Sequence, residues 1–370
     1  MTANGRAAVA DSDILLTGAT GFVGAFLLRR LLESSAVRVH CLVRSMTEPE
    51  AMERIRSAQI AYGLDLPDQA RVVPVAGDLA AAGLGLSPER FDDLARSVTT
   101  VIHAAARVNL VMPARMLEAA NVAGTREILR LARQGGAAVR FISTSEVFGR
   151  ARGVVDEDTP ALDCYEDTSG YGRTKRAAES LVLQARRDGL PAAVLRLDRV
   201  AGDSRTGACQ SDGDDLWLLV RSALSTGVLP DALVNLTPVD FAADAVLALT
   251  AAPAGSEPIA HICHPWPTRM TDVATALNHV GWPVRVLPAT EWAMTLQRLG
   301  EQPDCDPMVR LLPIIADRVM GGRPLFRAPR TTATLRRLGL HHPPVDVPLL
   351  GKYVRHLTAT GFLPATYHRG

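Results

Sequence analysis

The chain has 370 residues, of which 47% are hydrophobic and 21% are charged. That composition is typical of a globular protein and excludes a largely disordered one, and the length allows a large core with a smaller attached unit. The formal net charge of +1 argues against a nucleic-acid-binding protein, because phosphate binding requires a clear basic surplus.

The number and spacing of the cysteines, and the lack of long apolar segments, indicate where in the cell the protein is expected to be. Five cysteines are scattered and none form a Cys-x-x-Cys pair, which favours reduced thiols over disulfides or a zinc site. The first residues contain no signal-peptide-like apolar run, and no stretch approaches the roughly 18–20 apolar residues of a membrane span. We therefore expect a cytoplasmic protein that does not contact membranes.

The N-terminal half alternates short apolar runs with longer helical patterns, which predicts parallel βαβ units. The strands lack polar alternation, as strands buried on both faces do. This half predicts a doubly wound parallel α/β sheet of the Rossmann type. The expected strands are Asp13–Thr17, Val37–Val43, Arg71–Val75, Val101–Ala104, Val139–Ser143 and Ala193–Leu197, and the expected helices are Phe22–Leu32, Ala51–Gln59, Ala119–Gln134 and Tyr171–Arg187.

After about Gly202 the pattern becomes mostly helical, with frequent proline and glycine. We expect residues 1–205 to form the dinucleotide-binding domain and residues 206–370 a smaller helical part that binds substrate. A segment near 233–264 is expected to return to the first domain, with Leu233–Leu236 joining the main sheet. The expected helices of the second part are Asp215–Leu224, Glu291–Leu299, Leu311–Met320 and Leu349–Thr358.

A glycine-rich turn between the first strand and the first helix predicts a dinucleotide site. Gly18 permits the tight turn, Gly21 lets the backbone approach the phosphates, and Gly24 lets helix and strand pack closely. The N-terminus of the following helix then faces the pyrophosphate. The residues expected to bind the cofactor here are Gly18, Thr20, Gly21, Phe22, Val23 and Gly24.

The end of the second strand favours NADPH over NADH. No acidic residue precedes Glu48 there, and the guanidinium of Arg44 suits a 2′-phosphate, with Arg54 as a second candidate. Asp78, followed by Leu79, stands after the third strand, where its carboxylate either accepts a bond from the adenine or caps a helix. Asn121 is a polar residue on an apolar helical face, so it either bridges backbone near the active site or satisfies the core.

Three residues predict the chemistry. Tyr171 and Lys175 stand one helical turn apart, and Thr144 ends the Ser/Thr-rich fifth strand at the carboxyl edge, where open α/β sheets bind ligands. We expect Tyr171 to give a proton to a carbonyl oxygen while Thr144 donates to the same oxygen. Lys175 and the oxidised nicotinamide are both expected to lower the pKa of Tyr171, and Lys175 is also expected to hold the nicotinamide ribose.

The histidines favour structural roles. His103 is expected to pack at a strand end beside the cofactor. His261 and His264 are expected to lie in a loop and to bind no metal.

These residues, together with four later segments, resemble the thioester reductase branch of the extended short-chain dehydrogenases/reductases. That branch includes the terminal reductase domains of nonribosomal peptide synthetases, polyketide synthases and carboxylic acid reductases. The branch-specific segments are Gly202-Asp203-Ser204-Arg205-Thr206-Gly207, Thr237-Pro238-Val239-Asp240, Pro343-Pro344-Val345-Asp346 and Gly361-Phe362-Leu363-Pro364.

The resemblance implies that NADPH reduces an acyl or peptidyl thioester on the phosphopantetheine arm of a carrier protein, giving an aldehyde and in some members an alcohol, in natural-product biosynthesis. It assigns the chemistry to Thr144, Tyr171 and Lys175, and it implies that the C-terminal helices within residues 206–370 receive the acyl group and the carrier. One departure is Arg196-Leu197-Asp198, where the family usually has Arg-Pro-Gly. From residue 271 onward twelve Arg/Lys stand against seven Asp/Glu, which fits either solvated helix faces or docking of an acidic carrier.

Two other functions fit the same fold. One is a reductase or epimerase that acts on a free carbonyl compound or a nucleotide sugar. The other is a non-catalytic dinucleotide-sensing regulator, which would have no need of the Tyr171 and Lys175 pair.

Overall fold

The computed structural model describes residues 13–151, 153–162, 169–211, 214–251, 257–301, 309, 312 and 324–365. The chain divides into two compact units. The first unit comprises Met1–Asp198, Phe241–Cys263 and Pro324–His341. The second unit comprises Arg199–Asp240, His264–Arg323 and His342–Gly370. Each unit is therefore assembled from segments that are far apart in sequence.

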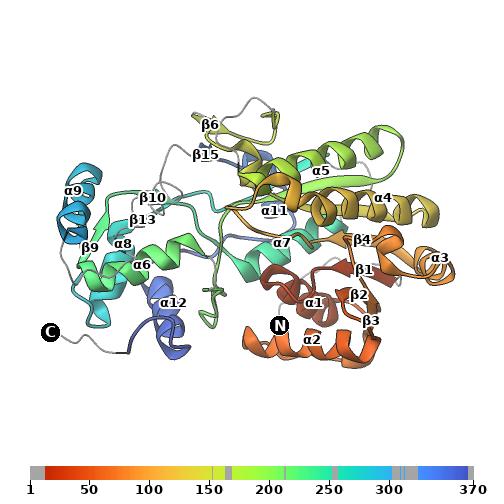
Figure 1. The fold of residues 1–370 in the computed structure, drawn as a ribbon, viewed down its shortest axis with the longest axis horizontal. Coiled ribbons are helices and arrows are strands. Elements are labelled where there is room, and N and C mark those ends of the chain that lie inside the picture. Colours follow the sequence, from red (N-terminus) through yellow and green to blue (C-terminus); the bar gives the residue numbers. More distant parts are fainter. Residues whose placement is uncertain are drawn as a thin grey trace. The chain divides into compact units, whose positions relative to one another are not determined.

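A seven-stranded parallel sheet forms the centre of the first unit (Figure 1), which confirms the predicted fold class. The strands β1, β2 and β3 follow one another toward one edge of the sheet, and the strands from β4 onward follow one another toward the opposite edge. The strand order therefore reverses between β1 and β4, and parallel sheets bind ligands at the carboxyl ends of the strands at such a switch point. In spatial order the strands are β3 (Val72–Gly77), β2 (Val39–Arg44), β1 (Asp13–Thr17), β4 (Val98–His103), β5 (Ala138–Thr144), β7 (Ala192–Leu197) and β12 (Ile259–Ile262).

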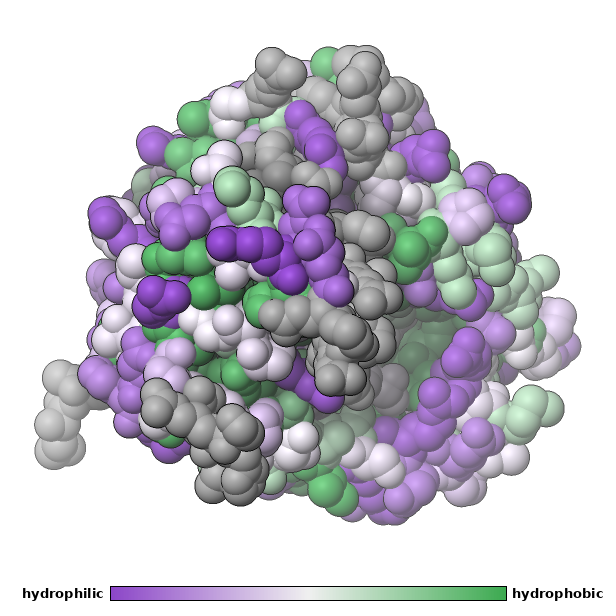
Figure 2. Space-filling model, turned by 60° about the vertical axis from the view of Figure 1, so that its left-hand side comes forward, coloured by the Kyte–Doolittle hydropathy of each residue, from purple (hydrophilic) through white to green (hydrophobic). Residues whose placement is uncertain are grey.

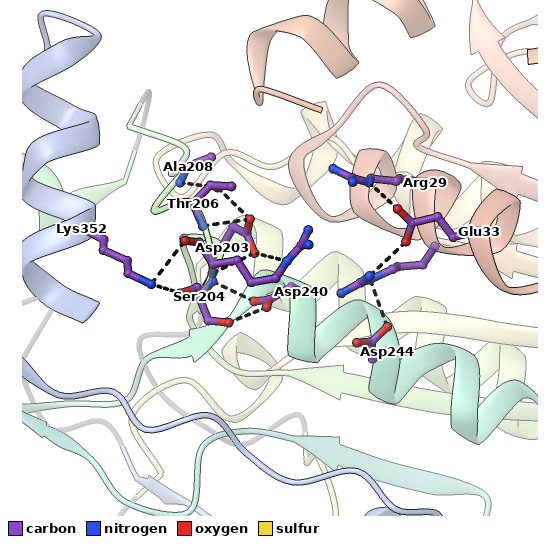
Figure 3. Close-up of polar contacts among 12 residues, drawn as sticks. Arg29, Glu33, Asp203, Ser204, Thr206, Ala208, Asp240, Asp244 and Lys352 are labelled. Carbon is purple, nitrogen blue, oxygen red and sulfur yellow. Dashed lines mark hydrogen bonds and ion pairs between the residues drawn. The ribbon is translucent and has the colours of Figure 1, made fainter. Parts of the chain in front are cut away.

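Helices cover both faces of this sheet. On one face lie α1 (Phe22–Ser34), α2 (Glu48–Ala61) and α7 (Val239–Ala251), and on the other lie α3 (Pro88–Ser97), α4 (Gly124–Gly135) and α5 (Gly170–Arg187). Arg30 on α1 binds Asp244 on α7 at 3.1 Å, as Figure 3 shows. The strand residues between the helices, such as Leu15 and Val139, are completely buried, because both faces of the sheet are covered.

Short elements complete the first unit. β6 (Val154–Val155) pairs in parallel with β15 (Leu325–Phe326), and α11 (Pro329–Arg337) packs against β12. The short helices are η1 (Gln69–Arg71), η2 (Ala82–Gly85), η3 (Ala114–Met116), the π-helix η4 (Ala119–Ala123) and η5 (Ser145–Phe148).

The second unit combines small two-stranded sheets with helices around its own core. The buried cluster includes Trp217, Leu277 and Tyr353. Its paired strands are β8 (Val200–Ala201) with β11 (Thr237–Pro238), β9 (Val228–Pro230) with β14 (Arg285–Leu287), and β10 (Leu233–Val234) with β13 (Thr268–Arg269). Its helices are α6 (Asp215–Thr226), α8 (Met270–His279), α9 (Ala289–Gly300) and α12 (Val347–Ala359).

Two of the family-specific segments meet in the second unit (Figure 3). Asp203 accepts a bond from Thr206 Oγ1 at 2.7 Å, and Asp240 accepts one from the Ser204 backbone N–H at 3.0 Å. Lys352 Nζ on α12 donates to the Ser204 carbonyl at 3.1 Å, and Tyr353 Oη donates to the Gly202 carbonyl at 3.0 Å. These segments therefore form a hydrogen-bonded turn that is tied to α12.

Three expectations about the elements require correction. Leu233–Val234 does not join the main sheet, because it pairs with β13 in the second unit. The added strand is β12, so His261 lies in a strand and not in a loop. The helix expected over Ala119–Gln134 is divided into the π-helix η4 and α4. The helix expected over Leu311–Met320 falls almost wholly outside the described residues.

The surface mixes polar and apolar residues on the face that Figure 2 shows, where hydrophilic and hydrophobic side chains are interspersed. In the described part of the chain, no helix is both long enough and apolar enough to span a membrane.

Candidate active site

The glycine turn forms a cradle in which side chains cannot be accommodated. Gly18 adopts φ +80°, and a Cβ there would lie 2.8 Å from the Ala105 backbone nitrogen. A Cβ on Gly24 would lie 1.9 Å from the Gly18 carbonyl oxygen. Gly21 precedes α1, and no side chain caps this helix. Its first backbone N–H groups are therefore available to an anion, and the cradle fits the pyrophosphate of a dinucleotide.

The other residues of the turn contribute mainly through their backbone. The Phe22 ring packs against Phe26 and Tyr62, with ring centres 5.5 and 5.1 Å apart, and is 6% exposed. Thr20 and Val23 are partly buried. Packing of Phe22 fixes the start of α1 against α2 and so holds the cradle in shape.

Arg44 and Arg54 lie together at the end of β2. Arg44 is exposed, and its backbone carbonyl accepts a hydrogen bond from the Arg54 guanidinium on α2. Two cations therefore meet beside the strand that neighbours β1. The Arg54 guanidinium is partly engaged in holding the backbone, so Arg44 is the freer of the two to bind an anion.

Asp78 and Leu79 form the edge of the cradle on the side of β3. Asp78 Oδ1 accepts a bond from the Ala80 backbone N–H at 2.9 Å, so the carboxylate caps this turn and keeps its second oxygen for another donor. A Cβ on Gly124 would lie 2.7 Å from the Leu79 carbonyl oxygen. The start of α4 therefore packs directly on Leu79.

Asn121 links the loop after β4 to α5. Its Oδ1 accepts from the Arg107 backbone N–H at 2.7 Å, and its Nδ2 donates to Thr174 Oγ1 at 3.0 Å. Thr174 Oγ1 in turn donates to the Tyr171 carbonyl at 2.8 Å. Asn121 is 2% exposed, so these bonds both satisfy a buried amide and tie the Arg107 backbone to α5, and the two alternatives drawn from the sequence are combined.

His103 is packed and neutral. Its Nδ1 lies 2.7 Å from Thr17 Oγ1 and its Nε2 lies 3.1 Å from Thr125 Oγ1. Burial lowers the pKa of His103 to about 3, and the nearby Lys175 ammonium contributes to this lowering. A histidine that stays neutral with both nitrogens engaged is a structural residue that ties β1, β4 and α4 together.

Thr144 ends β5 and caps η5, because its Oγ1 accepts from the Glu146 backbone N–H at 3.2 Å. This bond uses a lone pair of the hydroxyl and leaves its proton to donate. Next to it, Ser145 Oγ donates to Asp198 Oδ1 at 2.8 Å. Asp198 stands where the family resemblance led us to expect glycine, and its carboxylate holds the serine that adjoins Thr144.

Lys175 lies inside the protein, where α5 packs against β5 and η5. Its Nζ donates to the Ile142 carbonyl at 2.7 Å and lies 3.8 Å from the centre of the Phe141 ring. The residue is 2% exposed. Burial lowers the pKa of Lys175 to about 7, and the Glu179 carboxylate opposes this effect.

Tyr171 lies one turn earlier on α5. Burial raises the pKa of Tyr171 above its usual range, and the Glu146 carboxylate contributes to the rise. The expectation that Lys175 lowers the pKa of Tyr171 is therefore wrong for the protein alone. Tyr171 is a neutral phenol at physiological pH, which is the form that can donate a proton.

A buried ion pair joins α5 to β7. Glu179, one turn after Lys175, accepts two hydrogen bonds from Arg196 on β7, at 3.0 Å from Nε and 2.8 Å from Nη2. Arg196 Nη1 also lies 3.2 Å from His261 Nε2 on β12. His261 stacks on Phe326 with ring centres 4.0 Å apart, and burial lowers its pKa to about 3.

Sequence reasoning missed Ser145, Asp198 and Glu179. The spacing of Glu179, four residues after Lys175, was a local signal for a residue on the same helical face. The sequence marked Asp198 only as a departure from the family's Arg-Pro-Gly, and its bond to Ser145 could not be predicted because the sheet register brings the two together. Within the described ranges, no three His, Cys, Asp or Glu side chains form a group that could hold a metal ion.

The fold and site define a class of protein. A glycine cradle at the switch point of a parallel sheet fits a dinucleotide, and the helix that carries Tyr171 and Lys175 packs against the strand that ends at Thr144. The protein is an NAD(P)-dependent oxidoreductase.

Known proteins identify its family. The family model described as "Male sterility protein" matches residues 16–246. A linear gramicidin synthase polypeptide of Brevibacillus parabrevis is 35% identical over 364 residues, which cover 95% of this chain but only 7% of that polypeptide. The terminal R domain from the myxalamid PKS-NRPS biosynthetic pathway superposes with a TM-score of 0.88 at 37% identity, covering 96% of this chain and 93% of that one.

A thiolation-reductase di-domain from an archaeal non-ribosomal peptide synthetase shares the fold, with a TM-score of 0.81 at 22% identity over 95% of this chain and 76% of that one. The chain belongs to the family of terminal reductase domains of nonribosomal peptide synthetases and related synthases, within the extended short-chain dehydrogenases/reductases.

Proposed function

We propose that the protein uses NADPH to reduce an acyl or peptidyl thioester carried by a carrier protein, and so releases an aldehyde and a free thiol in natural-product biosynthesis. The observation that supports this most directly is the packing of α5, which bears Tyr171 and Lys175, against the strand that ends at Thr144. The similarity to terminal R domains supports the substrate class. The thiolation-reductase di-domain, in which both parts occur in one chain, supports the partner.

The chemistry of the bound cofactor is delivery of a hydride to the thioester carbonyl carbon. As negative charge develops on the carbonyl oxygen, Tyr171 donates its proton and the Thr144 hydroxyl donates a hydrogen bond. The resulting hemithioacetal collapses when the C–S bond breaks, which leaves the aldehyde and the thiol of the carrier arm. The Lys175 ammonium, which donates a hydrogen bond to the Ile142 carbonyl, contributes positive charge at the end of β5, the strand that carries Thr144. A second reduction of the aldehyde would give an alcohol.

The function is tested by incubating the protein with NADPH and an acyl-pantetheine thioester. We expect consumption of NADPH together with equal amounts of free thiol and of aldehyde plus alcohol, which mass spectrometry measures. Free aldehydes and nucleotide sugars serve as comparison substrates. The proposal would be contradicted if the protein converted nucleotide sugars and did not reduce thioesters.

Arg44 is expected to select NADPH. Because a guanidinium–phosphate hydrogen bond contributes roughly 1.5–3 kcal/mol, Arg44→Ala should weaken NADPH binding about 10- to 100-fold and leave NADH binding unchanged. Calorimetric titration with both cofactors measures this. Arg56→Ala is a matched control, because Arg56 is an exposed arginine of the same region, on α2. An equal loss of NADH affinity in the Arg44 variant would contradict this role.

The protonation of Lys175 predicts a pH dependence. Its pKa is lowered to about 7, so the ammonium is present below that pH and is lost as the pH rises through it. The value of kcat/KM for NADPH, which reports groups of the free enzyme, should therefore fall as the pH rises from about 7 to about 9. In a folded Lys175→Arg variant this fall should disappear, since a guanidinium keeps its charge. If kcat/KM of the unmodified protein did not change between pH 7 and pH 9, the Lys175 ammonium would not be required for the reaction.

A further inference from the structure

A cavity on the first unit lies outside the site described above. It measures about 680 Å³ and is bordered by η3, by η4 with the start of α4, and by α5. Figure 1 shows α4 and α5 side by side, and the two helices are in contact. The small residues Ala119, Ala123 and Ala177 form part of its floor, so the backbones of the two helices are accessible there.

This cavity is separate from the catalytic face of α5. Successive residues of an α-helix are rotated by about 100°, so Arg173 and Ala177 point away from the side that carries Tyr171 and Lys175. Arg173 and Ala177 line the cavity and are exposed, whereas Lys175 is buried against β5. The cavity therefore opens on the opposite face of α5, and Thr174, which also lines it, connects it to the Tyr171 carbonyl through a hydrogen bond of 2.8 Å.

The charges around the cavity are unbalanced. Arg115, Arg126 and Arg173 line it and are exposed, and none forms a side-chain hydrogen bond or ion pair with a residue in the described ranges. Glu118 also lines the cavity, which leaves a local surplus of two positive charges. Neighbouring arginines are paired instead: Arg130 binds Glu127 at 2.8 Å.

Exposed apolar residues precede and follow Arg115 in the same segment of the chain. Val108, Val111 and Met116 are 65%, 73% and 50% exposed, and they belong to the segment that leads into and forms η3. Arginine and methionine are enriched at protein interfaces, where apolar contacts exclude water from charged pairs. The combination is therefore typical of a surface that another protein covers.

The basic surplus beyond residue 271 is divided between the two units, and some of its described members are engaged. Arg330 in the first unit binds Asp158, and Lys352 in the second unit binds the Ser204 carbonyl. The unpaired arginines around the cavity are thus the better candidate for an acidic partner.

We propose that the η3–α5 surface, defined by Arg115, Arg126 and Arg173 around the floor at Ala119, Ala123 and Ala177, docks an acidic helix of the carrier protein that delivers the thioester. This docking proposal rests on the proposed function. Carboxylates on one helical face pair with guanidinium groups, and the small residues let the helix approach closely. A second copy of this chain is the poorer occupant, because a two-fold interface would set the basic rim against itself.

Charge reversal tests the docking surface. We expect Arg126→Glu and Arg173→Glu each to raise KM at least about tenfold for an octanoyl thioester on an acyl carrier protein, because like charges across an interface are strongly unfavourable. Their KM for octanoyl-pantetheine should not change. Arg187→Glu is the matched control on α5, since Arg187 is exposed and its side chain hydrogen-bonds only to Gln184 among the described residues. Thermal melting checks that each variant folds.

Calorimetric titration with the carrier protein measures docking independently of turnover. If the unmodified protein binds the carrier but reduces neither thioester, the proposed function fails while the docking surface stands. The surface is overturned if the two reversals leave carrier binding unchanged, or if they impair both substrates equally. It is also overturned if the unmodified protein is a dimer that Arg173→Glu dissociates.

Discussion

Replacing Tyr171 with phenylalanine is expected to lower kcat for thioester reduction by a factor of about 100 to 10,000, the usual contribution of a positioned proton donor. The pKa of Tyr171 lies above its usual range, so the phenol keeps its proton at neutral pH and is able to supply it. Phenylalanine removes only the hydroxyl. Stopped-flow measurement of NADPH oxidation under single-turnover conditions isolates the reduction step.

The variant should fold and bind cofactor normally. No residue in the described ranges hydrogen-bonds to the Tyr171 hydroxyl, so its removal leaves no buried partner unsatisfied. Its NADPH affinity and melting temperature are therefore the controls. Thr144→Val is a companion variant that removes the second donor to the same oxygen. Full activity of Tyr171→Phe would eliminate the proposed mechanism.

Replacing Glu179 with alanine is expected to reduce the free energy of unfolding by about 3–5 kcal/mol, because it leaves the buried Arg196 charge without its partner. Both residues are at most 2% exposed, and hydrogen bonds from Nε and Nη2 of Arg196 join them. Urea unfolding followed by circular dichroism measures the change. The urea concentration at the midpoint of unfolding should fall in proportion to the loss of unfolding free energy.

Glu33→Ala is the matched control for Glu179→Ala. Glu33 pairs with Arg29 at 2.8 Å and with Arg30 at 3.0 Å near the surface, where each such pair contributes about 1 kcal/mol or less. The double replacement Glu179→Leu with Arg196→Met should recover part of the loss, since it removes both buried charges. A loss below about 1 kcal/mol for Glu179→Ala would show that Arg196 finds another partner or water.

Local patterns predicted the frame of the site. The glycine turn, the strand ending at Thr144 and the Tyr171/Lys175 pair each occupy a few consecutive residues, so steric rules and helical spacing are enough to place them. The same rules predicted six strands of the main sheet. They failed for β12 and β10, because a short apolar run does not reveal which sheet it joins.

The sequence by itself determined that a parallel sheet carries a glycine cradle and a Tyr/Lys helix, since these features depend on neighbours within one or two turns of the chain. Only the tertiary structure decided that Asp198 holds Ser145, that Arg196 joins Glu179 to His261, and that the Lys175 ammonium binds the Ile142 carbonyl. Those contacts depend on strand register and helix packing, which bring together residues that lie far apart along the chain.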